Sequence, residues 1–264
     1  MKKKFPFYII LLFFLLSSCE EVIEFPLKDV SPAVVIEGTV TTLPGPYRVI
    51  ISQTTDYYNP GYLPHLSGAL VFVKDSKGHY WHFKEKKQGI YENNEFRGTP
   101  GITYSLQIEW KDQFFSATSV MQEPVPIDSL HARYFPGSRF ADPGYIIIIY
   151  FTDPPGKGNY YRIRMMRGDK TSTVIYVLDD QLTDGNLIPY YLFGASYESG
   201  DTAVVELQSI DKGVYEYMLT LSSVTASSQS GSTTAPANPV TNLSGGALGY
   251  FGALAVSRDT IIIE

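Results

Sequence analysis

Residues 104–110 read YSLQIEW, and the alternation within this stretch predicts the class of the fold. Every second side chain is large and apolar, with a polar side chain between each pair; the apolar set is Tyr104, Leu106, Ile108 and Trp110. Successive side chains of a strand point to opposite faces, so a period of two is typical of a strand with one face in a core. We therefore expect an all-β protein, with Trp110 facing inward beside its neighbours.

Four earlier stretches repeat the strand pattern, and turn-forming residues separate them. The stretches lie at 34–40, 48–52, 69–73 and 80–83. The segments between and after them contain Pro44-Gly45-Pro46, Asp75-Ser76-Lys77-Gly78 and Thr99-Pro100-Gly101. Short strands about ten residues apart, with Gly and Pro between them, are typical of a β-sandwich. Residues 33–123 are therefore predicted to form an N-terminal β-sandwich. The order GIY (89–91), GTPG (98–101) and Tyr104 resembles that of transthyretin-like sandwiches, which implies an immunoglobulin or transthyretin-like kind of fold.

The segment Pro124-Val125-Pro126 separates this first half from a second half with the same pattern. Each proline fixes φ and removes a backbone donor, so the segment is predicted to be a stiff joint. Further strands are expected at 129–135, 145–151, 160–166, 173–178, 202–207 and 260–263. The stretch 145–151 (YIIIIYF) is apolar throughout, which predicts a central strand buried on both faces. Residues 127–264 are therefore predicted to form a C-terminal β-sandwich; a single continuous β-domain is the alternative.

One helix is predicted in the second half, over residues 212–223. Apolar side chains recur there at helical spacing, at Val214, Tyr217, Met218, Leu221 and Val224. Asp211 is a suitable N-cap, and Ile210 and Tyr215 occupy the two positions of a hydrophobic staple. Residues 226–239 are rich in Ser, Thr and Ala without periodicity, and we expect a flexible loop there.

The composition excludes several classes of protein. The chain has 264 residues, a single cysteine and a net charge of −6. One cysteine can neither close an intramolecular disulfide nor supply the thiolates of a structural zinc site. The acidic balance argues against nucleic acid as a partner, because that binding depends on Lys and Arg neutralising phosphates.

The N-terminus predicts export and a lipid anchor. Lys2, Lys3 and Lys4 precede an apolar stretch at 5–16, which is typical of a signal peptide and too short to span a bilayer. The sole cysteine ends the segment Leu16-Ser17-Ser18-Cys19, which resembles a bacterial lipobox. This resemblance implies cleavage before Cys19 and its modification by lipid, with acyl chains such as palmitate. Two or more acyl chains anchor a protein stably to a membrane.

Cleavage would leave a tether at 19–32 and a more acidic mature chain. Removing the signal peptide 1–18 leaves 18 basic and 27 acidic residues, a net charge of −9. Glu20, Glu21 and Glu24 follow the cysteine, and this acidic start resembles a surface-export signal of Bacteroidota. We therefore expect the protein on the outer membrane, facing the cell exterior; a periplasm-facing placement is the alternative.

No motif in the sequence indicates catalysis, so we expect a non-catalytic protein with no cofactor and no metal. His79 and His82 are three residues apart in a predicted strand and would therefore face opposite sides. The acidic segment 179–186 lacks the ligand order of an EF-hand, although a looser calcium site is an alternative. The glycines of segment 246–252 lack the spacing of a dinucleotide-binding motif, and close backbone packing is predicted for them.

Aromatic residues are the remaining candidates for binding. Tyrosine doublets occur at 57–58, 160–161 and 190–191, and one member of each doublet in a strand must face outward. Exposed aromatic rings bind sugars or proteins; burial by loops or by the other domain is the alternative. The candidate binding residues are Tyr57, Tyr58, Tyr160, Tyr190, Tyr250 and Phe251.

Several segments, in this order, resemble a known family. They are 34–58, 67–75, 89–108, 157–165 and 238–257 (NPVTNLSGGALGYFGALAVS), and the last is the most specific. Together with the lipobox they resemble the Bacteroidota lipoproteins grouped as domain of unknown function 4249. The resemblance implies a cell-envelope lipoprotein, often encoded beside TonB-dependent outer-membrane receptors, and it carries over no catalytic residue. We therefore expect an accessory or ligand-binding partner of such a receptor in nutrient uptake; an independent glycan-binding or adhesin-type surface module is the alternative.

Overall fold

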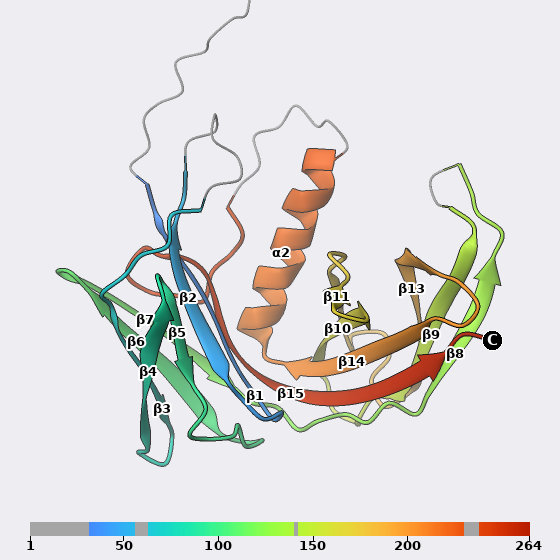
Figure 1. Cartoon of the computed structure of the whole chain (residues 1–264). Helices are drawn as coiled ribbons and strands as arrows, with labels where there is room; N and C mark the ends of the chain where they lie inside the picture. Colours follow the sequence, from blue (N-terminus) through green and yellow to red (C-terminus); the bar gives the residue numbers. More distant parts are fainter. Residues whose placement is uncertain (1–31, 56–62, 140–141, 230–237) are drawn as a thin grey trace, which may run out of the picture. The chain divides into compact units, whose positions relative to one another are not determined.

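A long strand near the C-terminus, β15 (Leu248–Ile262), joins the two halves of the chain. The computed structural model describes residues 32–55, 63–139, 142–229 and 238–264. The first half of β15 pairs in parallel with β1 (Val34–Thr41), and its second half pairs antiparallel with β14 (Thr202–Ile210) (Figure 1). One sheet therefore connects the regions predicted as two sandwiches. The strand predicted at 260–263 overlaps only the last three residues of β15, 260–262.

The strands of the first half extend the sheet from β1 in the order β1-β2-β5-β4-β3-β6-β7. They are β2 (Tyr47–Gln53), β3 (Leu70–Asp75), β4 (Tyr80–Lys87), β5 (Ile90–Asn93), β6 (Thr103–Trp110) and β7 (Gln113–Val120). Tyr104, Leu106 and Ile108 of β6 are buried in the first core cluster, as the period of two predicted. Trp110 packs against the same cluster while remaining partly exposed.

On the other side of β15 the sheet continues through β14 to β10 (Tyr160–Arg167). β10 also pairs with the two short strands β11 (Lys170–Thr171) and β12 (Tyr176–Asp179). Tyr161, Ile163 and Met165 of β10 are buried, as the alternation in this segment predicted.

A separate three-stranded sheet has the order β13-β9-β8. It comprises β8 (Ser129–Phe135), β9 (Gly144–Thr152) and β13 (Leu187–Tyr197). Ile147 and Ile149 of β9 belong to the second core cluster, together with residues of β10, β13 and β14. Ile146 and Ile148 are also buried, so β9 has buried side chains on both of its faces, as its apolar sequence predicted.

The described residues therefore confirm a strand-rich, sandwich-like fold of the all-β class. The division into 33–123 and 127–264 remains a prediction. The two regions do have separate core clusters, but β15 contributes to both: Phe251 belongs to the first cluster, while Ile261 packs against the second.

The predicted helix is present as α2 (Lys212–Gln229), and it ends later than residue 223. Asp211 caps it, since the Val214 N–H donates to Asp211 Oδ1 at 2.9 Å. Beyond the predicted end, the Thr225 hydroxyl donates to the Leu221 carbonyl at 2.9 Å, which lets a polar residue continue the helix. Among the described residues, no helix is both long and apolar enough to cross a membrane.

Of the glycines at 246, 249 and 252, Gly249 shows the predicted close backbone packing, whereas Gly246 has open space at its Cβ. Gly249 has a φ of +98°, and a Cβ at this position would lie 2.0 Å from the Ile36 carbonyl oxygen. These two residues are directly paired between β1 and β15, so only glycine allows the strands to approach this closely.

Candidate functional site

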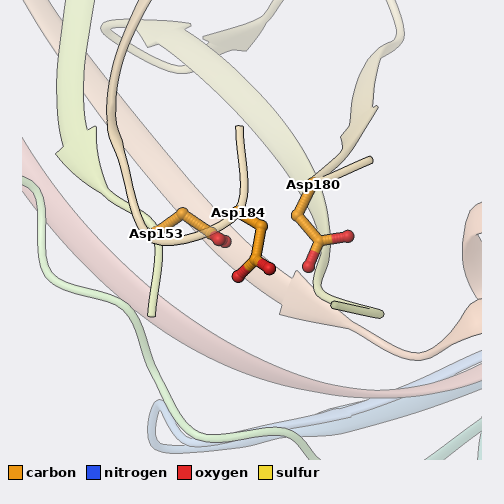
Figure 2. Close-up of side chains that lie close together, drawn as sticks. All are labelled: Asp153, Asp180 and Asp184. Carbon is orange, nitrogen blue, oxygen red and sulfur yellow. The ribbon is translucent and has the colours of Figure 1, made fainter. Parts of the chain in front are cut away.

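Three aspartates from two distant parts of the sequence meet beside the three-stranded sheet. Asp153 directly follows β9, Asp180 directly follows β12, and Asp184 lies in the turn before β13. One carboxylate oxygen of each lies within 4.8 Å of those of the other two, and Figure 2 shows the three side chains converging. Asp153 and Asp180 are each only 1% exposed, which is unusual for a charged residue.

The Asp153 carboxylate is bound on both oxygens. The Tyr161 hydroxyl donates to Oδ1, and the Gly185 N–H donates to Oδ2 at 3.0 Å. Burial raises the pKa of Tyr161, and the hydrogen bond to Asp153 raises it further. Tyr161 therefore keeps its proton and remains a donor to the carboxylate.

Backbone amides of one glycine-rich loop bind the other two carboxylates. The Gly158 N–H lies 3.0 Å from Asp180 Oδ1 and 2.8 Å from Oδ2, and the Asn159 N–H donates to Oδ2 at 3.0 Å. The Gly156 N–H donates to Asp184 Oδ1 at 2.7 Å. The aspartates therefore join the loop at 153–159 to the turn at 180–186.

This geometry allows two roles for the cluster. The first role is structural: the hydrogen bonds connect the loop at 153–159 to the turn at 180–186 and supply the donors that a buried carboxylate needs. Its oxygens are also the ligands that a hard cation such as Ca²⁺ prefers, and no ion pair between described residues involves any of the three aspartates. The hydroxyl oxygen of Thr183, in the same turn, is shielded from solvent and has no hydrogen-bond partner among the described residues.

The sequence indicated only part of this cluster. The acidic segment 179–186 predicted a tight turn, with a loose calcium site as the alternative, but nothing connected Asp153 to it. The sequence does not show that β9 ends next to the start of β13. The pairing of Thr152 with Leu187 places Asp153 beside the turn at 180–186. The expectation of no metal remains a prediction.

The candidate binding tyrosines lie in different surroundings. Tyr57 and Tyr58 fall outside the described residues. Tyr160 is partly buried, with its ring centroid 4.8 Å from that of Tyr215, and Tyr190 is partly buried against the second core cluster. The outward member of its doublet is Tyr191, which is 39% exposed and was not among the candidates.

The two candidates on β15 lie in core positions. Tyr250 is 9% exposed and its ring stacks on Tyr217 of α2, with centroids 4.8 Å apart. Phe251 is fully buried in the first core cluster. Their predicted binding role remains a prediction, and the contacts give both residues a packing role.

The histidines at 79 and 82 are separated, as their spacing predicted. His79 Nδ1 lies 2.8 Å from Asp75 Oδ2, whereas the His82 ring stacks on Phe72, with centroids 4.9 Å apart. A metal site formed by both histidines therefore finds no support in this arrangement.

Comparison with known proteins identifies a family over most of the chain. The family described as Domain of unknown function (DUF4249) matches residues 20–260. No curated protein matches the sequence.

Proposed function

Since this chain belongs to the family described as Domain of unknown function (DUF4249), we propose its function from its own residues: a non-catalytic lipoprotein of the outer membrane that assists a TonB-dependent receptor in nutrient uptake. The observation that carries the proposal is the cysteine at the end of Leu16-Ser17-Ser18-Cys19, preceded by three lysines and an apolar stretch. A signal of this kind leaves the mature protein on a lipid tether.

The anchor is tested by replacing its one reactive atom. In cells, Cys19→Ala removes the thiol that would carry the lipid, so the chain should leave the membrane fraction. Ser18→Ala is the matched control, because it keeps a small residue before the cysteine and should leave the chain membrane-bound. A Cys19→Ala chain that sediments with membranes as fully as the unmodified protein would contradict the proposal.

The outward-facing placement rests on Glu20, Glu21 and Glu24, which follow the cysteine. Protease added to intact cells should degrade the protein, whereas a periplasmic control protein should survive. Replacing the three glutamates by alanine should protect the chain from the protease while leaving it in the membrane fraction. Resistance of the unmodified chain would place it on the periplasmic side.

The receptor partnership is tested on the lipidated protein in mild detergent. Purification of the tagged full-length chain should recover a TonB-dependent receptor at a constant ratio, and an unrelated lipoprotein with the same tag should not. The independent glycan-binding module is retained as a second candidate function, because Tyr191 and Phe193 are exposed side by side on one strand.

A glycan array tests this second function. Binding to the array that is lost in Tyr191→Ala, together with failure to recover a receptor, would favour it.

A further inference from the structure

The three-stranded sheet has an outer face that points away from the core. Leu192, Ile147 and Ala132 occupy one row of its inner face and contact the second core cluster. The next row along the strands consists of Tyr191 of β13, Ile148 of β9 and His131 of β8. Its side chains must point to the opposite, outer face.

Large apolar side chains lie exposed on this outer face. Leu187, Tyr191 and Phe193 are 56%, 39% and 49% exposed. Ile146 and Ile148 lie between the flanking strands and are buried, although they belong to none of the three core clusters. Tyr191 and His131 flank Ile148 on the neighbouring strands, and Arg133 is paired with Ile146, so these side chains form continuous rows rather than a set of isolated side chains.

The rings on this face contact one another across the sheet. Phe193 of β13 meets Phe135 of β8 edge to face, with centroids 6.0 Å apart. Tyr191 and Phe193 lie nearly parallel, at an interplanar angle of 14°. An ordered aromatic surface binds a partner at low entropic cost, because its side chains are already held in place.

The charge of this sheet differs from that of the whole molecule. The chain carries 27 acidic residues, yet β8, β9 and β13 contain no Asp, Glu or Lys. Their one fixed charge is Arg133, which is exposed and forms no ion pair with a described residue. By comparison, β4 contains Lys84, Glu85, Lys86 and Lys87 within eight residues. Depletion of charge with enrichment of aromatics and Arg is typical of the centre of a protein interface.

The size of the face favours a small contact. Three strands about 4.8 Å apart, seven to eleven residues long, cover about 400 Å². A stable complex buries about 800 Å² on each partner, so this face alone is too small for a stable dimer of the chain. It fits a single segment of another protein.

The face lies at the other end of β15 from the strand where the described chain enters the sheet. The chain enters the sheet at β1, where Val35 pairs with Leu248 at the start of β15. The three-stranded sheet instead shares a core cluster with Ile263, which directly follows β15, and Ile261 near the end of β15 packs against the same cluster. A strand of this length extends about 45 Å, so β1 and the three-stranded sheet lie at opposite ends of β15.

We propose that this outer face is a docking surface for an apolar segment of a partner protein that also carries a carboxylate. The apolar side chains of the segment pack on Tyr191, Phe193 and Leu187, and its carboxylate pairs with Arg133. The inference rests on the proposed function, in which the partner is an outer-membrane receptor, and it names the surface that the receptor contacts.

Photo-cross-linking in cells tests the surface on the full-length, lipidated chain. The photoreactive residue benzoylphenylalanine at position 191 should cross-link to one outer-membrane protein, which mass spectrometry identifies. The same residue at position 80 is the control, because Tyr80 is 62% exposed on β4, outside the face. Cross-linking that is equal at the two positions, or absent at position 191, would overturn the proposal.

The identified protein is then purified and titrated with the full-length chain in detergent. Tyr191→Ser and Phe193→Ser should each weaken binding at least tenfold, and Arg133→Glu should do the same and remove most of the salt dependence. Tyr80→Ser should change the affinity less than twofold. Thermal unfolding of each variant checks that it is folded. Equal affinities for the unmodified chain and all three face variants would refute the docking surface.

Two other occupants are separate outcomes that also overturn the proposal. A concentration-dependent dimer in sedimentation, abolished by Tyr191→Ser, would assign the face to a second copy of the chain. Flotation with phosphatidylglycerol vesicles, abolished by the same change, would assign it to lipid. If the cross-linked protein is not a receptor, the docking surface stands and the receptor partnership falls. If a receptor copurifies equally with the unmodified chain and the face variants, the partnership stands and the docking surface falls.

Discussion

Asp211→Ala is the most informative change to the fold, because one carboxylate joins the helix to the first half of the chain. Asp211 Oδ1 accepts the Val214 N–H at 2.9 Å and so caps α2. Oδ2 accepts the Ser119 hydroxyl at 2.6 Å and the Val120 N–H at 3.0 Å, both from β7. Ser119 is 1% exposed, and its hydroxyl oxygen also accepts the Ala253 N–H of β15 at 2.8 Å.

The loss of free energy of unfolding follows from these contacts. The cap contributes about 1 kcal/mol. A buried hydroxyl left without its charged acceptor costs about 2 kcal/mol, and the more exposed Val120 N–H adds little because water replaces its partner. We therefore expect Asp211→Ala to lower the free energy of unfolding by about 3 kcal/mol, which is a fall of about 6–12 °C in Tm for a chain of this size. Asp211→Asn is the control, because asparagine still caps the helix and should lose about half as much.

The assay is urea unfolding of the chain without residues 1–19, followed by two signals. The only two tryptophans, Trp81 and Trp110, report on the first half, and the far-ultraviolet circular dichroism includes α2. A double-mutant cycle with Ser119→Ala should give a coupling of about 1–2 kcal/mol. A loss below about 1 kcal/mol for Asp211→Ala, or no coupling to Ser119, would refute the reasoning.

Three further predictions concern stability. Gly249→Ala should prevent folding or lower the free energy of unfolding by about 4 kcal/mol or more, because the new Cβ would meet the Ile36 carbonyl. Gly246→Ala is the control: its Cβ has open space, and its φ of +80° should cost only about 1–2 kcal/mol. Soluble yield and Tm measure both effects. Burial alone would raise the pKa of Asp75, but hydrogen bonds from His79 and Lys77 outweigh it and hold that pKa below its usual value. Asp75→Asn should therefore destabilise the protein at pH 7. The difference should shrink as the pH falls below about 4, because the unmodified carboxylate then takes up its proton in the unfolded chain first and in the folded chain only at lower pH; a difference that stays constant from pH 7 to pH 3 would contradict this. Asp180→Ala should lower the free energy of unfolding by about 3 kcal/mol through loss of its buried amide contacts, equally in EDTA and in calcium; calcium stabilisation that Asp184→Asn removes would instead assign a cation to the cluster.

Much of the fold was predictable because period-two alternation directly reports which face of a strand is buried. β6 and β10 show this, since their apolar side chains are the buried ones. Most of β15 was missed, because its first half is buried on both sides and contains glycines that favour a turn prediction. β13 was missed for a related reason: a proline and a glycine interrupt it, and both are tolerated there in a strand at the edge of its sheet.

The candidate sites were predicted less well, because each depends on contacts between distant segments. The tyrosine doublet at 190–191 correctly indicated that one ring faces outward, but the sequence does not say which one. That choice follows from the register of β13 on β9, which sends Tyr190 inward with Ile149. The aspartate cluster depends in the same way on pairing between β9 and β13 across more than thirty residues of chain.

The aspartate cluster and the outer face both depend on how β13 pairs with β9. Asp153 follows the last residue of β9, and its N–H donates to the Asn186 carbonyl at 3.0 Å, next to the first pair of β13 with β9. The aspartate cluster therefore fixes the residue at which β13 begins. Because side chains alternate along a strand, this starting point also decides which side chains of β13 face outward. Asp180→Ala should then weaken partner binding as well as stability, although Asp180 is buried and lies off the outer face. The discriminating measurement is the affinity of Asp180→Ala for the partner at a temperature well below the Tm of the variant. An unchanged affinity would show that the outer face keeps its order without the aspartate cluster.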